Sequence, residues 1–346
     1  MTLIYFILIL GLTVFIHESG HFLMAKKNGV YCYEFSLGMG PKLYSFNRKN
    51  DETTYSLRLF PIGGYVQMAG EEIEEDKNIP EDKRMQSKSV FQRLLIVLAG
   101  IFNNFILGIV LLLLMSLIYG APETKPYINS VDPTYNAYKV NVREGDLIKK
   151  INNKNIKSID DVMLEFQLIK PGSSIKVGLI DKDGNNKNVT IIPTKITEDG
   201  NDRYVYGIGF DTNIHKGFMH SIKYTFSKFG SIVRNLVKVI GNLVTGRLGI
   251  NSLSGPVGIY NVIGEQSKEG FSNVMYLAAY ISINVGFVNL IPFPAFDGGR
   301  ALFLIIEAIR KKPINAKTEN IIHTIGFALL MLLVIAITIN DIIRLF

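Results

Sequence analysis

Four long apolar stretches constrain this chain more than any other feature of its sequence. They are residues 2–25, 94–119, 271–291 and 321–339. Each is long enough to cross about 30 Å of hydrocarbon, which takes roughly twenty helical residues. Because lipid offers the backbone no hydrogen-bond partners, such segments must be helices. We therefore predict a polytopic α-helical membrane protein with four transmembrane helices, the first of which is retained because two lysines follow it and nothing basic precedes it.

The first apolar stretch contains a metal-ligand pattern. His17, Glu18 and His21 are its only acidic or basic side chains. Residues i and i+4 of a helix share one face, so both imidazoles can reach one ion, while Glu18 can contact a metal-bound water. The alternative is a chance pattern on the polar face of a soluble helix, but this helix has no polar face. Since ionisable groups in hydrocarbon are costly, the pattern predicts a zinc site.

Zinc in a catalytic site has three protein ligands, so a third must come from elsewhere in the chain. Asp297 is the carboxylate closest to a membrane helix, at the end of the third stretch in the sequence NLIPFPAFDGGRALF. Pro292 and Pro294 break the helix there, and Gly298 and Gly299 allow close backbone approach. We predict Asp297 as the third ligand.

Two other interpretations of these positions remain open. Asp297 could instead cap the helix expected over residues 300–309, because aspartate is common at N-caps. His215, His220 and His323 are competing ligands; the first two are expected on the other side of the membrane, and His323 is kept as a minor alternative.

Two histidines and a carboxylate leave a fourth zinc position for water, whose pKa falls toward neutral. Glu18 can then take the water proton as general base and return it to the leaving amine. Zinc would also polarise the scissile carbonyl. The residues thus predict peptide hydrolysis inside a membrane.

Basic residues indicate the orientation of the chain. Lysine and arginine are concentrated in residues 26–93 and in the loop that precedes the last stretch, so both segments are expected in the cytoplasm. The metal site then opens toward the cytoplasm, and the central region lies outside. The formal net charge of +7 is attributed to contacts with anionic lipid rather than with nucleic acid. Cys32 is the only cysteine, which excludes an intrachain disulfide.

The region between the second and third stretches is too long for a loop and predicts a folded domain. Residues 127–131 and 175–180 are expected to be strands, and residues 143–156 a turn, a strand and another turn. A short helix over residues 158–166 should have Ser158 as its N-cap. This order resembles a PDZ domain over about residues 121–195, which could bind peptide termini by strand addition or could merely fill space.

Two further segments lie near the membrane. Residues 218–248 predict an amphipathic helix that acts as a lid or strut at the bilayer surface. Residues 55–66 predict a cytoplasmic hairpin turning at PIGG, where Gly63 and Gly64 can take positive φ. The hairpin is either purely structural, or its edge pairs with an unfolded substrate strand, which cleavage needs because a helix hides its peptide bonds. Residues 71–88 are expected to be a solvated loop.

Taken together, these motifs closely resemble the site-2 protease family of intramembrane zinc metalloproteases, in its bacterial form with an inserted PDZ domain. HESGH at residues 17–21, FPIGGYVQMAGE at 60–71 and NLIPFPAFDGG at 289–299 follow one another in the family's order. AGIFNNF at 99–105 and SGPVGI at 254–259 resemble two further family segments. Ile101 and Phe296 depart from the family pattern, which usually has proline and leucine there.

The resemblance implies a role for each matching residue. His17, His21 and Asp297 would bind Zn²⁺, with Glu18 as catalytic base. Asn289, Pro292, Pro294 and Asn104 would shape or contact the bound substrate, beside Gly63 and Gly64 of the hairpin. The implied substrates are single-pass membrane proteins already trimmed outside, such as anti-sigma factors, or remnant signal peptides.

The domain organisation follows from these predictions. We expect residues 1–119 to hold two membrane helices and the hairpin (55–70), 120–200 the PDZ-like domain, 201–270 the amphipathic helix, and 271–346 the last two membrane helices. A catalytically inactive, zinc-stabilised PDZ scaffold is the main rival to an enzyme. A zinc or ion transporter would thread polar residues through several spans, and the second and fourth are too apolar for that.

Overall fold

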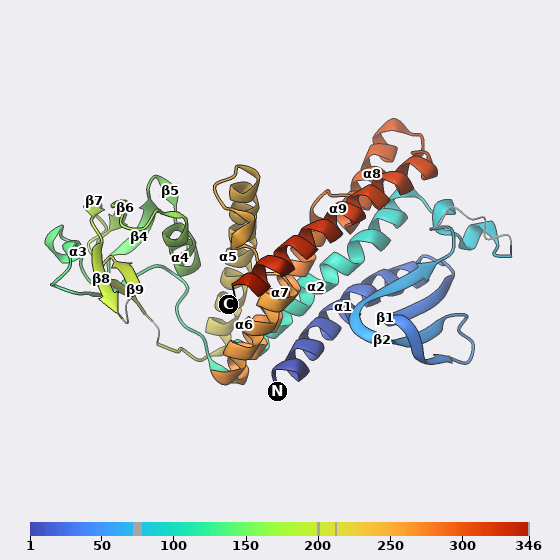
Figure 1. The fold of residues 1–346 in the computed structure, drawn as a ribbon, viewed down its shortest axis with the longest axis horizontal. Coiled ribbons are helices and arrows are strands. Elements are labelled where there is room, and N and C mark those ends of the chain that lie inside the picture. Colours follow the sequence, from blue (N-terminus) through green and yellow to red (C-terminus); the bar gives the residue numbers. More distant parts are fainter. Residues whose placement is uncertain (72–77, 199–200, 212, 345–346) are drawn as a thin grey trace. The chain divides into compact units, whose positions relative to one another are not determined.

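The computed structural model describes residues 1–71, 78–198, 201–211 and 213–344 (Figure 1). The chain divides into two compact units, one formed by residues 1–112 and 250–346 and the other by residues 113–249. Four helices of the described residues are long and apolar enough to cross a membrane. They are α1 (Thr2–Lys27), α2 (Val90–Tyr119), α7 (Phe271–Leu290) and α9 (Ala316–Ile343). These helices coincide with the four apolar stretches and confirm that part of the predicted fold.

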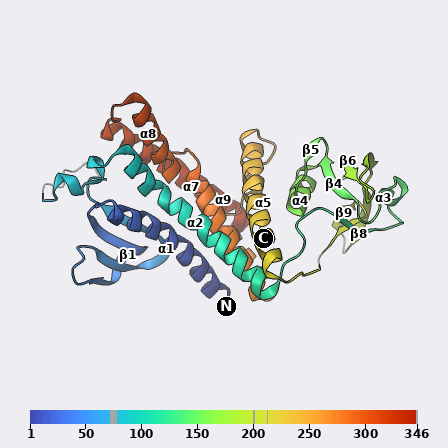
Figure 2. The same cartoon turned by 180° about the vertical axis from the view of Figure 1, so that it is seen from behind.

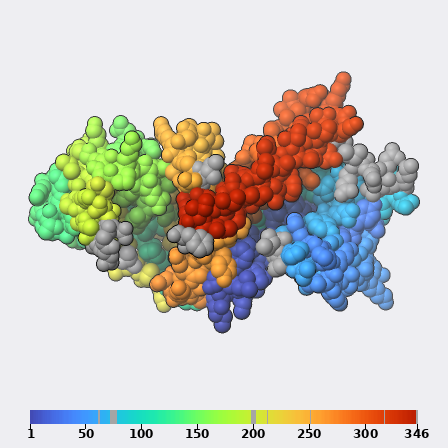
Figure 3. Space-filling view, viewed as in Figure 1, coloured from blue at the N-terminus to red at the C-terminus, as the bar shows by residue number. Residues whose placement is uncertain are grey.

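Helices α1, α2 and α7 run side by side in the first unit (Figure 2). Glycines make the close approaches: a Cβ on Gly20 of α1 would lie 2.4 Å from the carbonyl oxygen of Ala99 on α2. A Cβ on Gly108 of α2 would lie equally close, 2.4 Å, to the side chain of Ile283 on α7. Helix α9 lies on the visible face of this unit, where most of its apolar side chains are exposed (Figure 3). Such exposure suits a helix that faces lipid.

The hairpin is larger than the sequence predicts, and its turn lies elsewhere. Strand β1 (Cys32–Asn47) pairs antiparallel with β2 (Thr54–Met68), so the chain reverses at residues 48–53. The prediction of two strands over residues 55–66 that pair around PIGG is therefore wrong, because PIGG lies within β2.

Both strands of the hairpin bend sharply, and this explains the misleading PIGG signal. Residues 34–37 of β1 pair on one side with 54–57 and on the other with 64–67, while 42–47 pair with 54–58. The glycines near the bends, Gly38, Gly40 and Gly63, have φ of 86°, 85° and 85°. Such φ values favour glycine, so the glycines mark bends that fold the hairpin back on itself and leave 64–67 as an outer strand.

A salt bridge crosses this curled sheet. Arg58 donates from Nη2 to Glu34 Oε1 over 2.9 Å and to the Tyr65 hydroxyl over 2.5 Å. Burial raises the pKa of the Glu34 carboxyl, but its ion pairs with Arg58 and Lys42 outweigh it, so that pKa lies below its ordinary value. The bent strands are thus tied together by a charged hydrogen-bond network.

A short helix of the first unit, α6 (Pro256–Lys268), begins against the end of α9. Oδ2 of Asp341 accepts the backbone N–H groups of Gly255 and Gly258, each over 2.8 Å. A Cβ on Gly255 would lie 2.9 Å from that oxygen, so glycine leaves room for the carboxylate. Asp341 therefore satisfies the free N–H groups at the start of α6 and ties it to α9.

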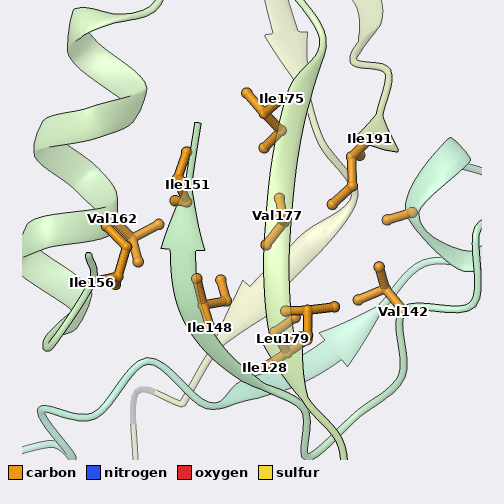
Figure 4. Close-up of a cluster of buried hydrophobic side chains, with 11 residues drawn as sticks. Ile128, Val142, Ile148, Ile151, Ile156, Val162, Ile175, Val177, Leu179 and Ile191 are labelled. Carbon is orange, nitrogen blue, oxygen red and sulfur yellow. The ribbon is translucent and has the colours of Figure 1, made fainter. Parts of the chain in front are cut away.

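The second unit contains a four-stranded antiparallel sheet in the order β5-β4-β6-β7. Its core consists of buried aliphatic side chains from the sheet and its surroundings, including Ile148, Ile151, Val177 and Leu179 (Figure 4). The strands are β4 (Leu147–Ile151), β5 (Lys154–Asn155), β6 (Ile175–Ile180) and β7 (Asn186–Ile191). The predicted strand over residues 175–180 and the strand within 143–156 are confirmed.

The remaining strands of this unit form two small pairs. Strand β3 (Ile128–Val131) pairs with β10 (Ile208–Phe210), and β8 (Thr194–Glu198) pairs with β9 (Asn201–Val205). A short helix, α3 (Asn136–Lys139), follows β3. Strands β3 and β10 lie about 80 residues apart in the sequence. Their pairing therefore joins the start of the folded domain to its end.

The short helix predicted near Ser158 is confirmed as α4 (Ile159–Leu168). The Ser158 hydroxyl accepts the Asp161 N–H, and the Asp161 carboxylate accepts the Ser158 N–H in return, which is a complete capping box. The amphipathic segment is confirmed as helix α5 (Phe218–Val244). The 71–88 segment contains two short 3₁₀ turns, Glu81–Lys83 and Met85–Ser87, while its residues 72–77 lie outside the described residues.

Helix α5 packs on α4 through charged and hydroxyl side chains. The Ser158 and Ser231 hydroxyls lie 2.8 Å apart, and Lys228 Nζ donates to Asp160 Oδ1 over 2.7 Å. Lys238 donates to Asp161 Oδ1 over 3.0 Å. The basic face of α5 therefore covers the acidic face of α4 within the second unit.

Candidate metal centre

Two histidine rings and one carboxylate meet beside the first membrane helix. His17 and His21 lie one turn apart on α1, and each residue is 9% exposed. Their Nε2 atoms lie 3.2 Å apart. Oδ2 of Asp297, at the start of α8 (Asp297–Arg310), lies 3.1 Å from His17 Nε2 and 3.3 Å from His21 Nε2. The structure thus brings together the three residues predicted as zinc ligands.

The size of this triangle suits a tetrahedral zinc site. Zinc binds histidine nitrogen and carboxylate oxygen at about 2.0–2.2 Å, and tetrahedral angles place such ligand atoms roughly 3.3 Å from one another. The three observed separations run from 3.1 to 3.3 Å. Among the described residues, this is the one cluster of three or more histidine, cysteine or acidic side chains that could hold a metal ion.

The hydrogen bonds of the histidine rings also favour a cation. His21 Nδ1 lies 2.9 Å from the carbonyl oxygen of Ile96, which can only accept, so Nδ1 carries the ring proton. In the neutral form of this ring, the lone pair of Nε2 points toward Asp297 Oδ2. Lone pairs that meet in a buried space repel one another unless a positive ion lies between them, so the donor set fits Zn²⁺.

The loop that delivers Asp297 is held in an unusual conformation. Helix α7 ends at Leu290, and the chain turns through a segment containing Pro292 and Pro294 before α8 begins. Ala295 has φ of 97°, a conformation that residues with a Cβ rarely adopt. The N-cap position of α8 is Phe296, so Asp297 lies in the first turn of the helix and is not its cap.

Glycines after Asp297 let α8 pack under this loop. A Cβ on Gly298 would lie 2.4 Å from the carbonyl oxygens of Leu290 and Ile291, and one on Gly299 would lie 2.4 Å from that of Phe293. Any larger residue at either position would push the helix away from the loop. This is the close backbone approach expected from the sequence.

The competing histidines lie outside the triangle. His323 on α9 accepts the Ala295 N–H at Nδ1 over 3.3 Å, so it contacts the loop rather than the ligand atoms. His220 lies in the second unit, where its Nε2 is 3.0 Å from the carbonyl oxygen of Ala121. His215 pairs through its backbone with Ala121 as well.

A cavity of about 640 Å³ opens beside the metal ligands. Glu18 lines it together with the three ligand residues, next to Gly63, Gly64 and Asn289. Pro292, Pro294 and Asn104 are not part of its lining. The structure therefore brings the predicted base and three of the predicted substrate-binding residues to the cavity, and leaves the other three outside it.

The outer strand of the hairpin forms one wall of this cavity. Residues 63–66 and Met68 of β2 line it, and a Cβ on Gly64 would lie 3.1 Å from Glu18 Cγ. Arg300 of α8 forms an ion pair with Glu71, just after β2. Both residues also line the cavity, so an ion pair links the hairpin to the helix that carries Asp297.

Sequence analysis missed two contributions of α2 to this site, those of Ile96 and Gly100. The Ile96 carbonyl orients His21, and a Cβ on Gly100 would lie 2.4 Å from His21 Nε2 and 2.9 Å from His17 Cε1. A backbone carbonyl carries no sequence signal. Gly100 could have been found, because a glycine within a long apolar helix usually marks a close approach.

The chain is similar to known proteins over nearly its whole length. The sequence profile of peptidase family M50 matches residues 5–333. The zinc metalloprotease RasP of Bacillus licheniformis is 34% identical over all of this chain and 99% of its own length. The regulator of sigma-W protease RasP of Bacillus subtilis is 32% identical over the same shares, and a putative zinc metalloprotease of Clostridium acetobutylicum is 35% identical over 97% of this chain and 96% of its own.

Solved structures match only part of the chain. The PDZ domain of an SdrC-like protein from Listeria monocytogenes is 25% identical, with a TM-score of 0.21, and the match covers 25% of this chain and 86% of that one. The second domain of the listeria protein Lin2157 is 22% identical, with a TM-score of 0.22, over 27% of this chain and 91% of that one.

Proposed function

Because the chain belongs to peptidase family M50, the site-2 family of zinc metalloproteases, we propose that it cleaves single-pass membrane proteins within or near their membrane-spanning segments. The observation that carries this proposal is the triangle of His17, His21 and Asp297, which lies on a helix long and apolar enough to cross a membrane. A hydrolytic centre on such a helix is within reach of peptide bonds embedded in lipid.

In this proposal the ligands and the base have separate roles. Zinc held by the three ligand residues supplies a Lewis acid that acidifies water and polarises the scissile carbonyl. Glu18, which lines the same cavity, takes the proton of the attacking water and delivers it to the leaving nitrogen. The hydrogen bond from His21 Nδ1 to Ile96 keeps that ring's Nε2 directed at the metal position.

The number of ligands favours catalysis over a structural role. Structural zinc sites usually have four protein ligands, whereas catalytic sites keep one position open. The described residues provide three ligand atoms here, all within 4.8 Å of one another. This arrangement supports the enzyme rather than a zinc-stabilised scaffold.

The substrate would bind as an extended strand along the hairpin. Residues 64–67 of β2 form an outer strand of the curled sheet, and Gly63 and Gly64 lie at the cavity. An added strand gains main-chain hydrogen bonds and exposes the peptide bond that a helix would conceal. Asn289 also lines the cavity and is proposed to contact that strand, while Pro292 and Pro294 shape the loop between α7 and α8.

The proposed orientation follows the basic loops. The metal site would open toward the cytoplasm, and residues 120–200 would form a PDZ-like domain outside, able to bind peptide termini or to exclude large proteins. Residues 1–119 and 271–346 would form the membrane part, and 201–270 a lid or strut. One relative is named a regulator of sigma-W protease, which supports anti-sigma-factor-like substrates; remnant signal peptides are the second class.

The experiment that tests this function separates metal binding from cleavage. Glu18→Gln, purified in detergent, should retain zinc and lose cleavage of a single-span substrate. His17→Ala should lose both. Glu265→Gln, at an exposed position on α6, is the matched control and should keep both. Cleavage that persists in Glu18→Gln would contradict the proposed mechanism.

A further inference from the structure

Three positions four residues apart on α2 face the two histidines of α1. The Ile96 carbonyl accepts from His21 Nδ1, Gly100 leaves room for both rings, and the side-chain amide of Asn104 lies 3.2 Å from His17 Nδ1. Residues at this spacing share one helix face. Within this stripe, Ile96 and Asn104 contact the Nδ1 side of each ring, away from the triangle of ligand atoms, while Gly100 lies beside the ligand atom Nε2 of His21.

Asn104 is not placed to touch a substrate. It is fully buried, with 0% exposure, and it does not line the cavity. Helix α7 packs against Asn104. The Ser282 hydroxyl donates to the backbone carbonyl of Asn104 over 2.9 Å, and a Cβ on Gly286 would lie 3.2 Å from Asn104 Cβ. Its side chain is thus confined to the space beside His17.

The amide of Asn104 can face His17 in two ways, and they suit different tautomers of the ring. With Nδ2 toward Nδ1, which is how the amide is placed in the structure, the neutral ring carries its proton on Nε2, and Oδ1 has no hydrogen-bond partner among the described residues. With Oδ1 toward Nδ1, the amide oxygen accepts the Nδ1 proton, and the Nε2 lone pair is free to bind a metal. Only the second arrangement makes His17 a ligand.

We propose that Asn104 is a positioning residue for the metal centre: its Oδ1 accepts the Nδ1 proton of His17 and holds the Nε2 lone pair toward zinc, as the Ile96 carbonyl does for His21. This inference rests on the proposed metal site. It replaces the expected substrate contact of Asn104 with a contact to a ligand. Partners of this kind fix ring orientation and tautomer, and their loss typically weakens metal binding 10- to 100-fold.

The test compares an acceptor with an apolar group of similar size. Asn104→Leu removes the acceptor, whereas Asn104→Asp keeps a carboxylate oxygen beside Nδ1. Asn103→Ala is the matched control, because Asn103 Nδ2 donates to the Ile16 carbonyl and so joins α2 to α1 without touching a ring. Full-length proteins in detergent are titrated with zinc against a chelator, and the absorption spectrum of the Co²⁺-loaded protein reports on ligand geometry.

We expect Asn104→Leu to weaken zinc binding roughly 10- to 100-fold and to alter the Co²⁺ spectrum, while its metal-free melting temperature changes no more than that of Asn103→Ala. Asn104→Asp should bind zinc within about threefold of the unaltered protein. If Asn104→Asp loses zinc as strongly as Asn104→Leu, or if Asn104→Leu binds it normally, the inference is wrong.

The same measurement on His17→Ala keeps this inference distinct from the proposed function. If His17→Ala retains stoichiometric zinc, the proposed metal site itself is wrong. If His17→Ala loses zinc and Asn104→Leu does not, the proposed metal site is supported and only the proposed role of Asn104 is wrong. If Asn104→Leu fails to fold, zinc binding by Asn104→Asp and by Asn103→Ala still tests the inference. Loss of zinc by Asn104→Asp, with zinc retained by Asn103→Ala, would contradict the acceptor role of Asn104.

Discussion

A Cβ atom on Gly100 would lie 2.4 Å from Nε2 of His21, the atom that faces the metal position. Helix α2 therefore passes so close to the ligands that any side chain there displaces a ring. The metal centre depends on this missing side chain as well as on the ligands that are present.

We expect Gly100→Ala to lower zinc content and proteolysis together, because an added methyl group clashes with both imidazoles. Metal analysis and a cleavage assay measure the two effects. Gly11→Ala is the control, since a Cβ there meets no atom within 4 Å. A Gly100→Ala protein with full zinc content would show that the helices can separate without cost.

Asp341→Ala should destabilise the protein without altering the metal ligands. Two N–H groups at the start of α6 lose their acceptor, and each buried unpaired group costs about 1–3 kcal/mol. A lower melting temperature in detergent is the expected measurement. Asp341→Asn keeps one side-chain oxygen and should lower the melting temperature less. Asp183→Ala, at an exposed turn, should leave the melting temperature unchanged.

The contact between α4 and α5 should weaken in acid. Burial raises the pKa of the Asp161 carboxyl, but hydrogen bonds from Lys238 and from the Lys157 N–H outweigh it, so that pKa is lowered on folding. A lowered pKa gives stability that is fully present above the unfolded value of about 3.9 and is lost as the pH falls through the folded value.

Hydrogen exchange of residues 218–244 measures this pH effect. Exchange should quicken, after correction for its intrinsic pH dependence, once the pH drops below about 4. Asp161→Asn should flatten that dependence, whereas Asp132→Asn, away from α5, should leave it intact. If hydrogen exchange depends on pH equally in the unaltered protein and in Asp161→Asn, the Asp161 carboxylate is not the cause of the pH effect.

Ala295→Gly should stabilise the loop that carries Asp297. Ala295 holds φ of 97°, which glycine adopts without a clash, so the substitution should gain up to about 1 kcal/mol. Ala301→Gly, within α8, should instead lose about 1 kcal/mol because glycine is a poor helix former. Melting temperatures of the two variants should therefore move in opposite directions.

The sequence predicts the parts of this fold that depend on local pattern. Apolar length locates the four membrane helices, and Ser158 predicts the start of α4 because an N-cap signal lies at the end of the helix itself. The i, i+4 spacing of His17 and His21 predicts their shared face for the same reason. These signals are local in the sequence and do not depend on long-range contacts.

Long-range contacts are what the sequence does not predict. The hairpin was misplaced because a glycine-rich bend inside a strand has the same local signal as a turn, and only pairing with residues 34–37 distinguishes the two. The acceptor for His21 lies 75 residues away and is a backbone atom. The Asp341 cap on α6 joins residues more than 80 positions apart, so neither segment alone reveals it.

The separation of the metal ligands along the chain has a consequence for biosynthesis. The ribosome makes His17 and His21 more than 270 residues before it makes Asp297. A nascent chain that has inserted its first helix therefore has two of the three side chains that bind zinc. The protease therefore cannot cleave neighbouring nascent proteins before its own Asp297 has been synthesised and has reached the two histidines.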